Sequence, residues 1–292
     1  MKTFKEKLDE KIFVITTEIG PPKGVSMTGI IEELKSVRGR VDAVNVTDQQ
    51  SAVMRLGSIA ASKTLLDNGY EPICQVTCRD RNRIALQSDV LSAGVLGIKN
   101  ILVMTGDHPL LGDHPAAKPV YDLDSVNLLS AIKSLQEGYD LAGKRLESAP
   151  SFCVGAVVNP GAEPLEPEII KMEKKIEAGA FFFQTQAIFD IKKFEIFLNS
   201  ISHFRDKIRL LGGIVPIKSL KMAQYMNDHI PGVFIPESIM QRLEKTTDIT
   251  EESVAIAADL MSALRERCDG IHFMPIRANH LVAKVLDKSG VR

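Results

Sequence analysis

A short, nearly all apolar run followed by a segment of helical period recurs eight times along the 292 residues of the chain. Runs of this length and composition are typical of parallel strands that helices cover on both faces. The runs are FVITTE (13–18), VDAVNVT (41–47), PICQVTC (72–78), NILVMTG (100–106), SFCVGAVVN (151–159), AFFFQTQ (180–186), IRLLGGIV (208–215) and GIHFMP (270–275). Strict alternation with helices predicts parallel βαβ units. Eight units predict an α/β fold, a single (β/α)8 TIM barrel domain over residues 1–292.

The segments between these runs have the apolar spacing of helices. In residues 27–37 one stripe is apolar, and Ser26 is the expected N-cap. Similar patterns cover residues 51–67, 81–96, 123–138, 166–178, 190–201, 218–229 and 251–267. The connection 230–250, between the seventh and eighth runs, is longer than usual and contains IPESIMQRL. It predicts an extra helix after Pro236.

A doubly wound open sheet is the rival architecture, because it also alternates strands and helices. That fold usually carries a glycine fingerprint after its first strand. Here the corresponding turn reads EIGPPKG, and no phosphate-binding P-loop motif occurs along the chain. The missing fingerprint favours the barrel.

Charge and composition exclude several classes of partner. Lysine and arginine number 36 against 37 acidic residues, and tryptophan is absent, so we expect no nucleic-acid partner. No apolar stretch reaches about 18 residues, so we expect no membrane span. The charged N-terminal segment has no signal-peptide block, and four cysteines in no cluster-binding pattern fit reduced thiols. These features predict a cytoplasmic protein.

Polar side chains collect where the predicted strands end. In a barrel these ends converge on the active site, although a single polar residue there often only begins a turn. The set mixes carboxylates, amides, hydroxyls and one guanidinium, which suits a planar heterocycle such as a pterin or an isoalloxazine. Its members are Glu18, Thr47, Asp48, Gln49, Gln75, Thr77, Thr105, Asp107, Asn159, Gln184, Gln186 and Arg277.

The tetrapeptide Gly-Asp-His-Pro occurs at residues 106–109 and again at 112–115, which raises the question of a metal site. Only Asp107 ends a predicted strand, while Asp113 lies six residues into the following loop. A metal would need four side chains to converge from a loop that holds two prolines. We therefore predict no metal site and assign the function to Asp107.

Four segments in order resemble the methylenetetrahydrofolate reductase family. They are TEIGPPKG at the first strand end, VMTGDHP at the fourth, GAFFFQTQAIFD (179–190) and GGIVPI (212–217). The resemblance spans roughly residues 11–289. It implies a flavin-binding barrel that reduces 5,10-methylenetetrahydrofolate to 5-methyltetrahydrofolate.

The resemblance implies roles for two acidic residues. Glu18 matches the family's general acid, which protonates the methylene bridge so that flavin N5 can deliver hydride to the carbon. Asp107 matches the aspartate between the flavin's pyrimidine end and the folate. Its negative charge would support a cationic iminium. Both residues are therefore predicted catalytic and substrate-binding groups.

Further residues match the family's ligand contacts. Gln186 matches a glutamine that contacts the pterin, and Arg277 lies in a slightly different place from the family's arginine after the last strand; both are predicted contacts to the folate. The predicted cofactor contacts, besides Asp107, are Thr47, Gln75, Thr105, Gly106, Tyr121, Asp124, Asn159 and Lys175. The chain departs from the family where Gln75 replaces a histidine and Thr105 an arginine. The arginines of CRDRNR (78–83) either replace that cation or form a solvated cluster at a helix start.

The expected cofactor is FAD, with FMN as the alternative because the phosphate contacts depart from the family pattern. Electrons would come from NADH, from NADPH or from an iron–sulfur partner subunit, since this chain lacks a cysteine set for a cluster. Folate is the expected small-molecule partner. Whether the protein forms a homo-oligomer stays open. Two other functions also stay open: a pterin-dependent methyltransferase and a non-catalytic barrel subunit of a redox complex.

Overall fold

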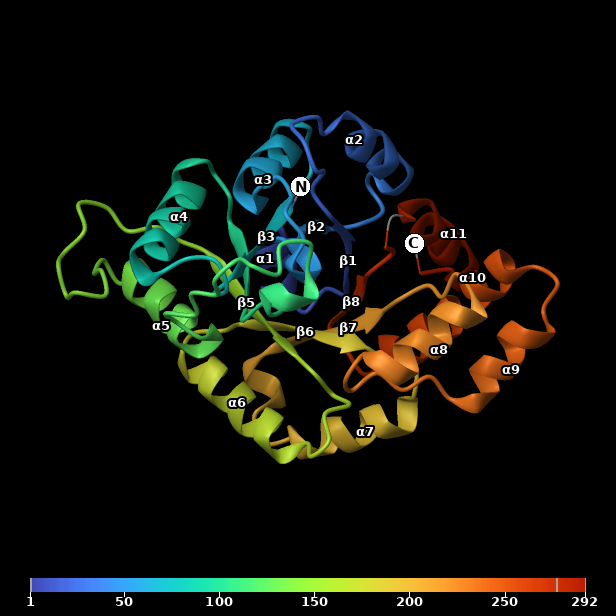
Figure 1. The fold of residues 1–292 in the computed structure, drawn as a ribbon. Helices are drawn as coiled ribbons and strands as arrows, with labels where there is room; N and C mark the ends of the chain where they lie inside the picture. The colour runs from blue at the N-terminus through green and yellow to red at the C-terminus, as the bar shows by residue number, and fades with distance from the viewer. Residues whose placement is uncertain (1, 277, 292) are drawn as a thin grey trace.

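The eight predicted strands form a closed parallel barrel in the computed structural model, which describes residues 2–276 and 278–291 (Figure 1). Each strand pairs with the next, and β8 pairs with β1 through Val14↔Gly270 and Thr16↔His272. The strands are β1 (Val14–Ile19), β2 (Ala43–Val46), β3 (Pro72–Thr77), β4 (Asn100–Met104), β5 (Cys153–Val158), β6 (Phe182–Ala187), β7 (Arg209–Ile214) and β8 (Gly270–Phe273). Closure confirms the TIM barrel over the open doubly wound sheet.

The helices surround the barrel, and the extra helix after Pro236 is present as α9 (Figure 1). They are α1 (Phe4–Asp9), α2 (Thr28–Leu34), α3 (Ser58–Asp67), α4 (Arg83–Val95), α5 (Ser125–Gln136), α6 (Glu166–Glu177), α7 (Ile191–Ser200), α8 (Leu220–His229), α9 (Glu237–Lys245), α10 (Ile249–Arg265) and α11 (Asn279–Ser289). Short 3-10 turns occur at Lys35–Val37, Gln50–Ala52, Pro109–Leu111 and Arg205–Lys207. Across the residues that the structure describes, none of the helices is long and apolar enough to cross a bilayer.

Two details of the helix prediction were wrong, and both concern helix starts. The helix predicted from residue 51 begins at Ser58, because Ser51 and Ala52 adopt left-handed backbone angles that a helix cannot contain. Ser26 is not the N-cap of α2. Met27 holds that position, and the Ser26 hydroxyl donates to Thr28 Oγ1 instead of accepting a helical N–H.

The barrel interior changes from apolar to polar along the strands. Near the strand starts, the inner side chains form an apolar cluster that includes Val14, Ile73, Leu102 and Phe182. Two residues further along come Thr16, Gln75 and Gln184, because alternate residues of a strand face the same side. This gradient puts hydrogen-bonding groups at the carboxyl end, where a barrel carries its site.

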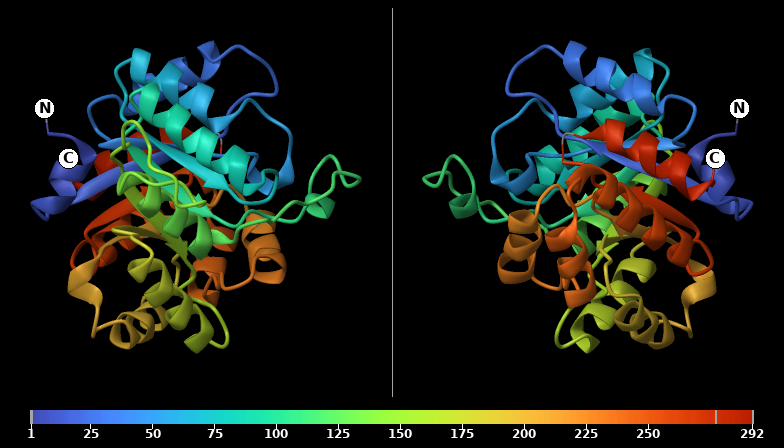
Figure 2. Two further views of the ribbon diagram at one scale, coloured as in Figure 1. Left: turned by 90° about the vertical axis from the view of Figure 1, so that its left-hand side faces the viewer. Right: turned by 90° about the vertical axis from the view of Figure 1, so that its right-hand side faces the viewer.

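Helix α1 closes the opposite end of the barrel. Its Phe4 and Leu8 are fully buried and join the inner apolar cluster, and the Phe4 ring meets Phe182 edge to face at 5.3 Å. The Glu71 carboxylate accepts the Phe4 backbone N–H at 2.9 Å. Figure 2 shows α1 at one end and the loop after β4 projecting from the other. The plug shields the floor of the barrel from water.

Truncation of the plug should destabilise the whole barrel. A Phe4→Ala change removes a fully buried ring and leaves a cavity, which costs about 3–5 kcal/mol of unfolding free energy. Urea denaturation followed by circular dichroism measures the loss. Phe234→Ala is the control, because Phe234 is 46% exposed and its loss should cost about 0.5 kcal/mol. Equal losses for the two variants would contradict the plug's role.

Candidate active site

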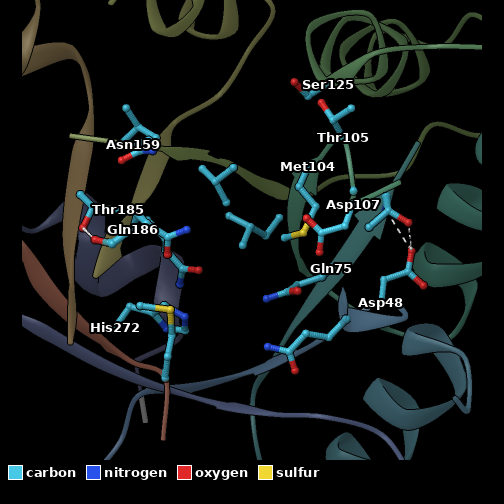
Figure 3. Close-up of a pocket in the computed structure, with 18 of the residues that line it drawn as sticks. Asp48, Gln75, Met104, Thr105, Asp107, Ser125, Asn159, Thr185, Gln186 and His272 are labelled. Atoms are coloured by element: carbon cyan, nitrogen blue, oxygen red, sulfur yellow. Dashed lines mark hydrogen bonds between the residues drawn. The ribbon is translucent and has the colours of Figure 1, made fainter. Parts of the chain in front are cut away.

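A cavity of about 450 Å³ opens at the carboxyl end of the barrel (Figure 3). In Figure 3, Asn159, Thr185 and Gln186 lie on one side of this cavity, and Met104 and Asp107 lie on the other. The predicted site residues that line it are Glu18, Gln75, Thr105, Gly106, Asp107, Asn159, Lys175 and Gln186. Residues from five different strand ends therefore share one cavity, as expected for a barrel.

Glu18 is the penultimate residue of β1, and its side chain is 11% exposed inside a set of polar groups. Gln50 Nε2 donates to Glu18 Oε1 at 3.2 Å, and Gln75 Nε2 donates to Oε2 at 3.3 Å. His272 Nε2 lies 3.7 Å from Oε2. These partners come from three separate segments and hold the carboxyl group at the cavity wall. Gln75, at the position where the resemblance implies a histidine, thus contacts the acidic residue.

A layer of paired polar side chains supports the cavity floor. Asn45 and Gln184 exchange two amide hydrogen bonds of 2.6 and 3.1 Å. Their strands, β2 and β6, are not neighbours, so these bonds cross the barrel interior. Thr16 Oγ1 and His272 Nδ1 lie 2.9 Å apart. Buried polar groups that satisfy one another in this way fix side-chain orientation.

The basic cluster after β3 divides into three different environments. Arg79 is 2% exposed, lines the cavity, and forms two hydrogen bonds to the Asp80 carboxylate. Its Nη1 also donates to the Asp107 carbonyl at 3.3 Å, so the guanidinium ties the third strand's exit to the fourth. Arg81 pairs with Asp48 and Asp89. Arg83 is exposed and pairs with Asp122, as expected for a solvated charge cluster at a helix start.

Two lysines and the carboxylate of Glu168 line the end of the cavity near α5 and α6. Lys175 is 2% exposed and lines the cavity, and its ammonium group donates to the Val157 carbonyl at 2.6 Å. Burial lowers the pKa of Lys175 to about 8, against an ordinary value of 10.5. Lys171 lines the same end. Ser125, at the start of α5, has a buried hydroxyl without a hydrogen-bond partner among the described residues.

Three predicted cofactor residues lie outside the cavity wall. The Thr47 hydroxyl is buried behind it and has no hydrogen-bond partner in the described part of the chain. Tyr121 donates its hydroxyl to the Gly106 carbonyl at 3.1 Å. The Asp124 carboxylate caps α5 by accepting the Asn127 N–H. Their contact with a cofactor stays a prediction, and Arg277 lies outside the described residues.

The second Gly-Asp-His-Pro copy lies away from the cavity. Asp113 pairs with Lys23 and accepts the Met54 N–H, which ties the loop to the segment before α3. His114 is exposed beside Asp113, and His108 accepts the Leu110 N–H. Within residues 2–276 and 278–291, no group of three or more His, Cys, Asp or Glu side chains is arranged to hold a metal.

Several cavity residues had no assigned role in the prediction. Gln50 lies in the irregular loop after β2, Ser125 and Lys171 lie on helices, and His272 lies inside β8. Ser125 was detectable in principle, because it begins α5 and the helix N-termini of a barrel face the same end as the strand C-termini. The contact between His272 and Glu18 depends on closure of the barrel.

Comparison with known proteins now decides the family. The methylenetetrahydrofolate reductase family profile matches residues 3–290. The chain belongs to the methylenetetrahydrofolate reductase family. This finding confirms the resemblance that the sequence motifs indicated.

Family relatives are similar at low identity. The 5,10-methylenetetrahydrofolate reductase of Escherichia coli is 24% identical over 288 residues, covering 95% of this chain and 91% of that protein. Methylenetetrahydrofolate reductase 2 of Schizosaccharomyces pombe is 28% identical over 257 residues, covering 80% of this chain. The match covers only 38% of that longer protein.

Solved structures share the fold. An uncharacterized protein from Clostridium thermocellum, described as binding two copies of 5-methyl-5,6,7,8-tetrahydrofolic acid, superimposes with a TM-score of 0.65. It is 18% identical, and the match covers 99% of each chain. At this identity the likeness establishes the barrel architecture alone.

The buried ammonium group of Lys175 should make stability depend on pH. Between the lowered pKa of about 8 and the ordinary 10.5, the unfolded chain binds more protons than the folded chain, so stability rises with pH. Relative to Lys175→Met, the wild-type unfolding free energy should gain about 2 kcal/mol between about pH 7 and about pH 9.5. Denaturation at several pH values measures this difference, with Lys174→Met as the exposed neighbouring control. Parallel pH profiles for wild type and Lys175→Met would contradict the assignment.

Proposed function

We propose that this protein is a flavin-dependent reductase that converts 5,10-methylenetetrahydrofolate to 5-methyltetrahydrofolate. The observation that carries the proposal is the placement of Glu18, Asp107 and Gln186 around one cavity of about 450 Å³. A cavity of this size lies in the range of small-molecule sites. Family membership supports the reaction class, and the folate bound by the Clostridium thermocellum protein supports the substrate class.

Glu18 supplies the proton in this proposal. The methylene carbon of the substrate bridges N5 and N10, and the product keeps the carbon on N5, so the bond to N10 breaks. Protonation of N10 by the Glu18 carboxyl group makes it a leaving group and opens the bridge to an iminium ion. Hydride addition to that carbon completes the methyl group. Each turnover consumes one proton and one hydride.

The partners of Glu18 stabilise the carboxylate that remains after proton transfer. Gln50 and Gln75 each donate an amide N–H, one to each carboxylate oxygen. His272 lies against the same group, and its other nitrogen faces the Thr16 hydroxyl. We assign His272 as a positioning residue, since its ring is 3% exposed and is held between Thr16 and Glu18.

The opposite walls of the cavity suit the edges of a pterin. Gln186 and Asn159 present amides on one side, and Asp107 presents a carboxylate on the other (Figure 3). A pterin edge carries both donors and acceptors, which amides and a carboxylate match. The Asp107 charge also favours the iminium cation over neutral alternatives. Arg79 donates to the backbone carbonyl of Asp107 and so supports the loop after β4. This contact leaves the Asp107 carboxylate unpaired with the Arg79 guanidinium.

Two features of the cavity lining support a flavin cofactor in this proposal. Ser125 has an unpartnered buried hydroxyl among the described residues, beside a cavity end lined by Lys171 and Lys175. These groups would hold phosphate oxygens, and FAD is the proposed form, with FMN as the alternative. When bound, a reduced flavin supplies the hydride. The proposed electron source is NADH, NADPH or a partner protein.

The purified protein should bind flavin and pass its electrons to folate. We expect a yellow protein, because oxidised flavins absorb at about 450 nm. This absorbance should disappear on anaerobic reduction. Addition of 5,10-methylenetetrahydrofolate should restore the absorbance and yield 5-methyltetrahydrofolate. A colourless protein that neither FAD nor FMN reconstitutes would refute the proposal and favour a flavin-independent pterin enzyme.

The acid role of Glu18 can be separated from cofactor reduction. A Glu18→Gln variant keeps the side-chain shape but has no acidic proton, so folate reduction should slow by about 100-fold or more. Reduction of the bound flavin by its electron donor should stay near the wild-type rate. Stopped-flow absorbance measures the two half-reactions separately. Glu173→Gln, on the outer face of α6, is the control, and a normal folate rate in Glu18→Gln would remove the assignment.

A further inference from the structure

The second Gly-Asp-His-Pro copy lies against the turn that carries Gln50, one of the hydrogen-bond donors to Glu18. We call residues 49–52 the Gln50 turn. It follows β2, and most of it lines the central cavity. Among the described residues that line this cavity, none comes from 112–115. The second copy can therefore affect the site only through the residues that it contacts.

The backbone of the Gln50 turn has an unfavourable shape. Gln49, Ser51 and Ala52 have positive φ angles of 43°, 56° and 56°. Residues other than glycine disfavour this left-handed region, so the turn keeps its shape only where its surroundings hold it. The Gln50 side chain is exposed, so little packing holds its amide group. The contacts of the turn's backbone therefore decide where Gln50 points.

Gly112 contacts the turn at Ala52. A β-carbon built on Gly112 would lie 1.8 Å from the Ala52 carbonyl oxygen and 2.8 Å from the Ala52 β-carbon. The φ angle of Gly112 is −102°, which other residues adopt readily. Glycine is therefore required here because the two loops approach closely, and not because of its backbone freedom.

Asp113 joins the two loops that carry the contact between Glu18 and Gln50. Its Oδ1 accepts the Met54 backbone N–H at 3.0 Å, just after the turn, and its Oδ2 pairs with the Lys23 ammonium group. Lys23 lies in the loop that follows Glu18 and β1. One carboxylate thus connects the loop after the acid to the loop that carries the amide.

Arg79 holds the other end of the Gln50 turn. Its Nη2 donates to the Gln49 carbonyl at 3.3 Å, and its Nη1 donates to the Asp107 carbonyl at 3.3 Å. The loop after β4 therefore contributes to the site twice. The first copy presents Asp107 to the cavity, and the second copy contacts the Gln50 turn.

We propose that the second Gly-Asp-His-Pro copy is a positioning element, in which Gly112 and Asp113 hold the Gln50 turn so that Gln50 reaches Glu18. The inference rests on the proposed function, in which Glu18 is the acid. The Gln50 amide donates to the carboxylate that remains after proton transfer, and hydrogen bonds to charged oxygens are the stronger ones. Release of the turn removes this bond and slows folate reduction without changing a contact to the substrate.

Hydrogen exchange followed by mass spectrometry tests the hold on the turn without any turnover. Peptides that cover residues 49–56 should exchange about 10-fold faster or more in Asp113→Ala than in wild type, because the Met54 N–H loses its acceptor. Gly112→Ala should have the same effect, since its methyl group separates the two loops. Gly57→Ala is the matched control, because a β-carbon there meets nothing within 4 Å.

Stopped-flow absorbance tests the consequence for the acid. The bound flavin is reduced with dithionite and mixed with 5,10-methylenetetrahydrofolate. Gln50→Ala should slow flavin reoxidation by about 10-fold, the range of one hydrogen bond to a charged group. Asp113→Ala should slow it by up to the same factor, and the double variant by no more than Gln50→Ala, because both changes remove one contact. The substrate concentration that gives half the limiting rate should not change.

A further variant keeps the test decisive if Asp113→Ala does not fold. Lys23→Gln removes only the exposed partner of the Asp113 ion pair. It should speed exchange of residues 49–56 and slow flavin reoxidation, both by less than Asp113→Ala would.

The possible results separate this inference from the function it rests on. Wild-type exchange in Asp113→Ala and Gly112→Ala would overturn the positioning role, and so would a wild-type reoxidation rate in Gln50→Ala. Losses that multiply in the double variant would overturn it as well. All three results would leave the reductase proposal in place. A wild-type protein whose reduced flavin is not reoxidised by 5,10-methylenetetrahydrofolate would overturn the proposed function, and the positioning role with it.

Discussion

The backbone hydrogen bonds between β8 and β1 are the constraint on which the rest of this structure depends. They close the sheet and set Thr16 opposite His272, residues that lie at opposite ends of the sequence. Closure brings His272 to within 3.7 Å of Glu18 and makes the strand ends converge on one cavity. An open sheet with the same strands would leave its two edge strands far apart. The acidic residue would then lack one of its neighbours.

Closure also requires polar side chains inside the barrel to hydrogen-bond to one another, because water cannot hydrate side chains buried there. The interior accordingly changes from apolar to polar along the strands. Apolar residues and the α1 plug fill the floor, and paired groups such as Asn45 and Gln184 occupy the next layer. Among the described residues, the unpaired Ser125 hydroxyl lines the cavity, whereas the unpaired Asn100 Oδ1 lies at the start of β4, away from it.

The charge distribution around Glu18 separates the proposed tasks of the site. Neutral amides from Gln50 and Gln75 contact the acid, while the lysines lie at the other end of the cavity near α5 and α6. Arg79 is buried but matched by Asp80, so it orders the loops without adding an unpaired charge.

The sequence by itself determined the periodic alternation of strands and helices, and with it the barrel, the extra helix α9 and the polar strand ends from Glu18 to Gln186. These features are local, because the spacing of apolar residues and the polar residues that follow each strand are visible within a few residues of sequence. Only the tertiary structure decided that Ser58 and not residue 51 starts α3, that α1 plugs the floor, and that Thr47, Tyr121 and Asp124 lie outside the cavity wall. It also decided that Gln50 and His272 meet Glu18. The α1 plug and the contacts of Gln50 and His272 with Glu18 join segments that are distant in the sequence, so they form only when the chain folds around the closed sheet and no local pattern encodes them.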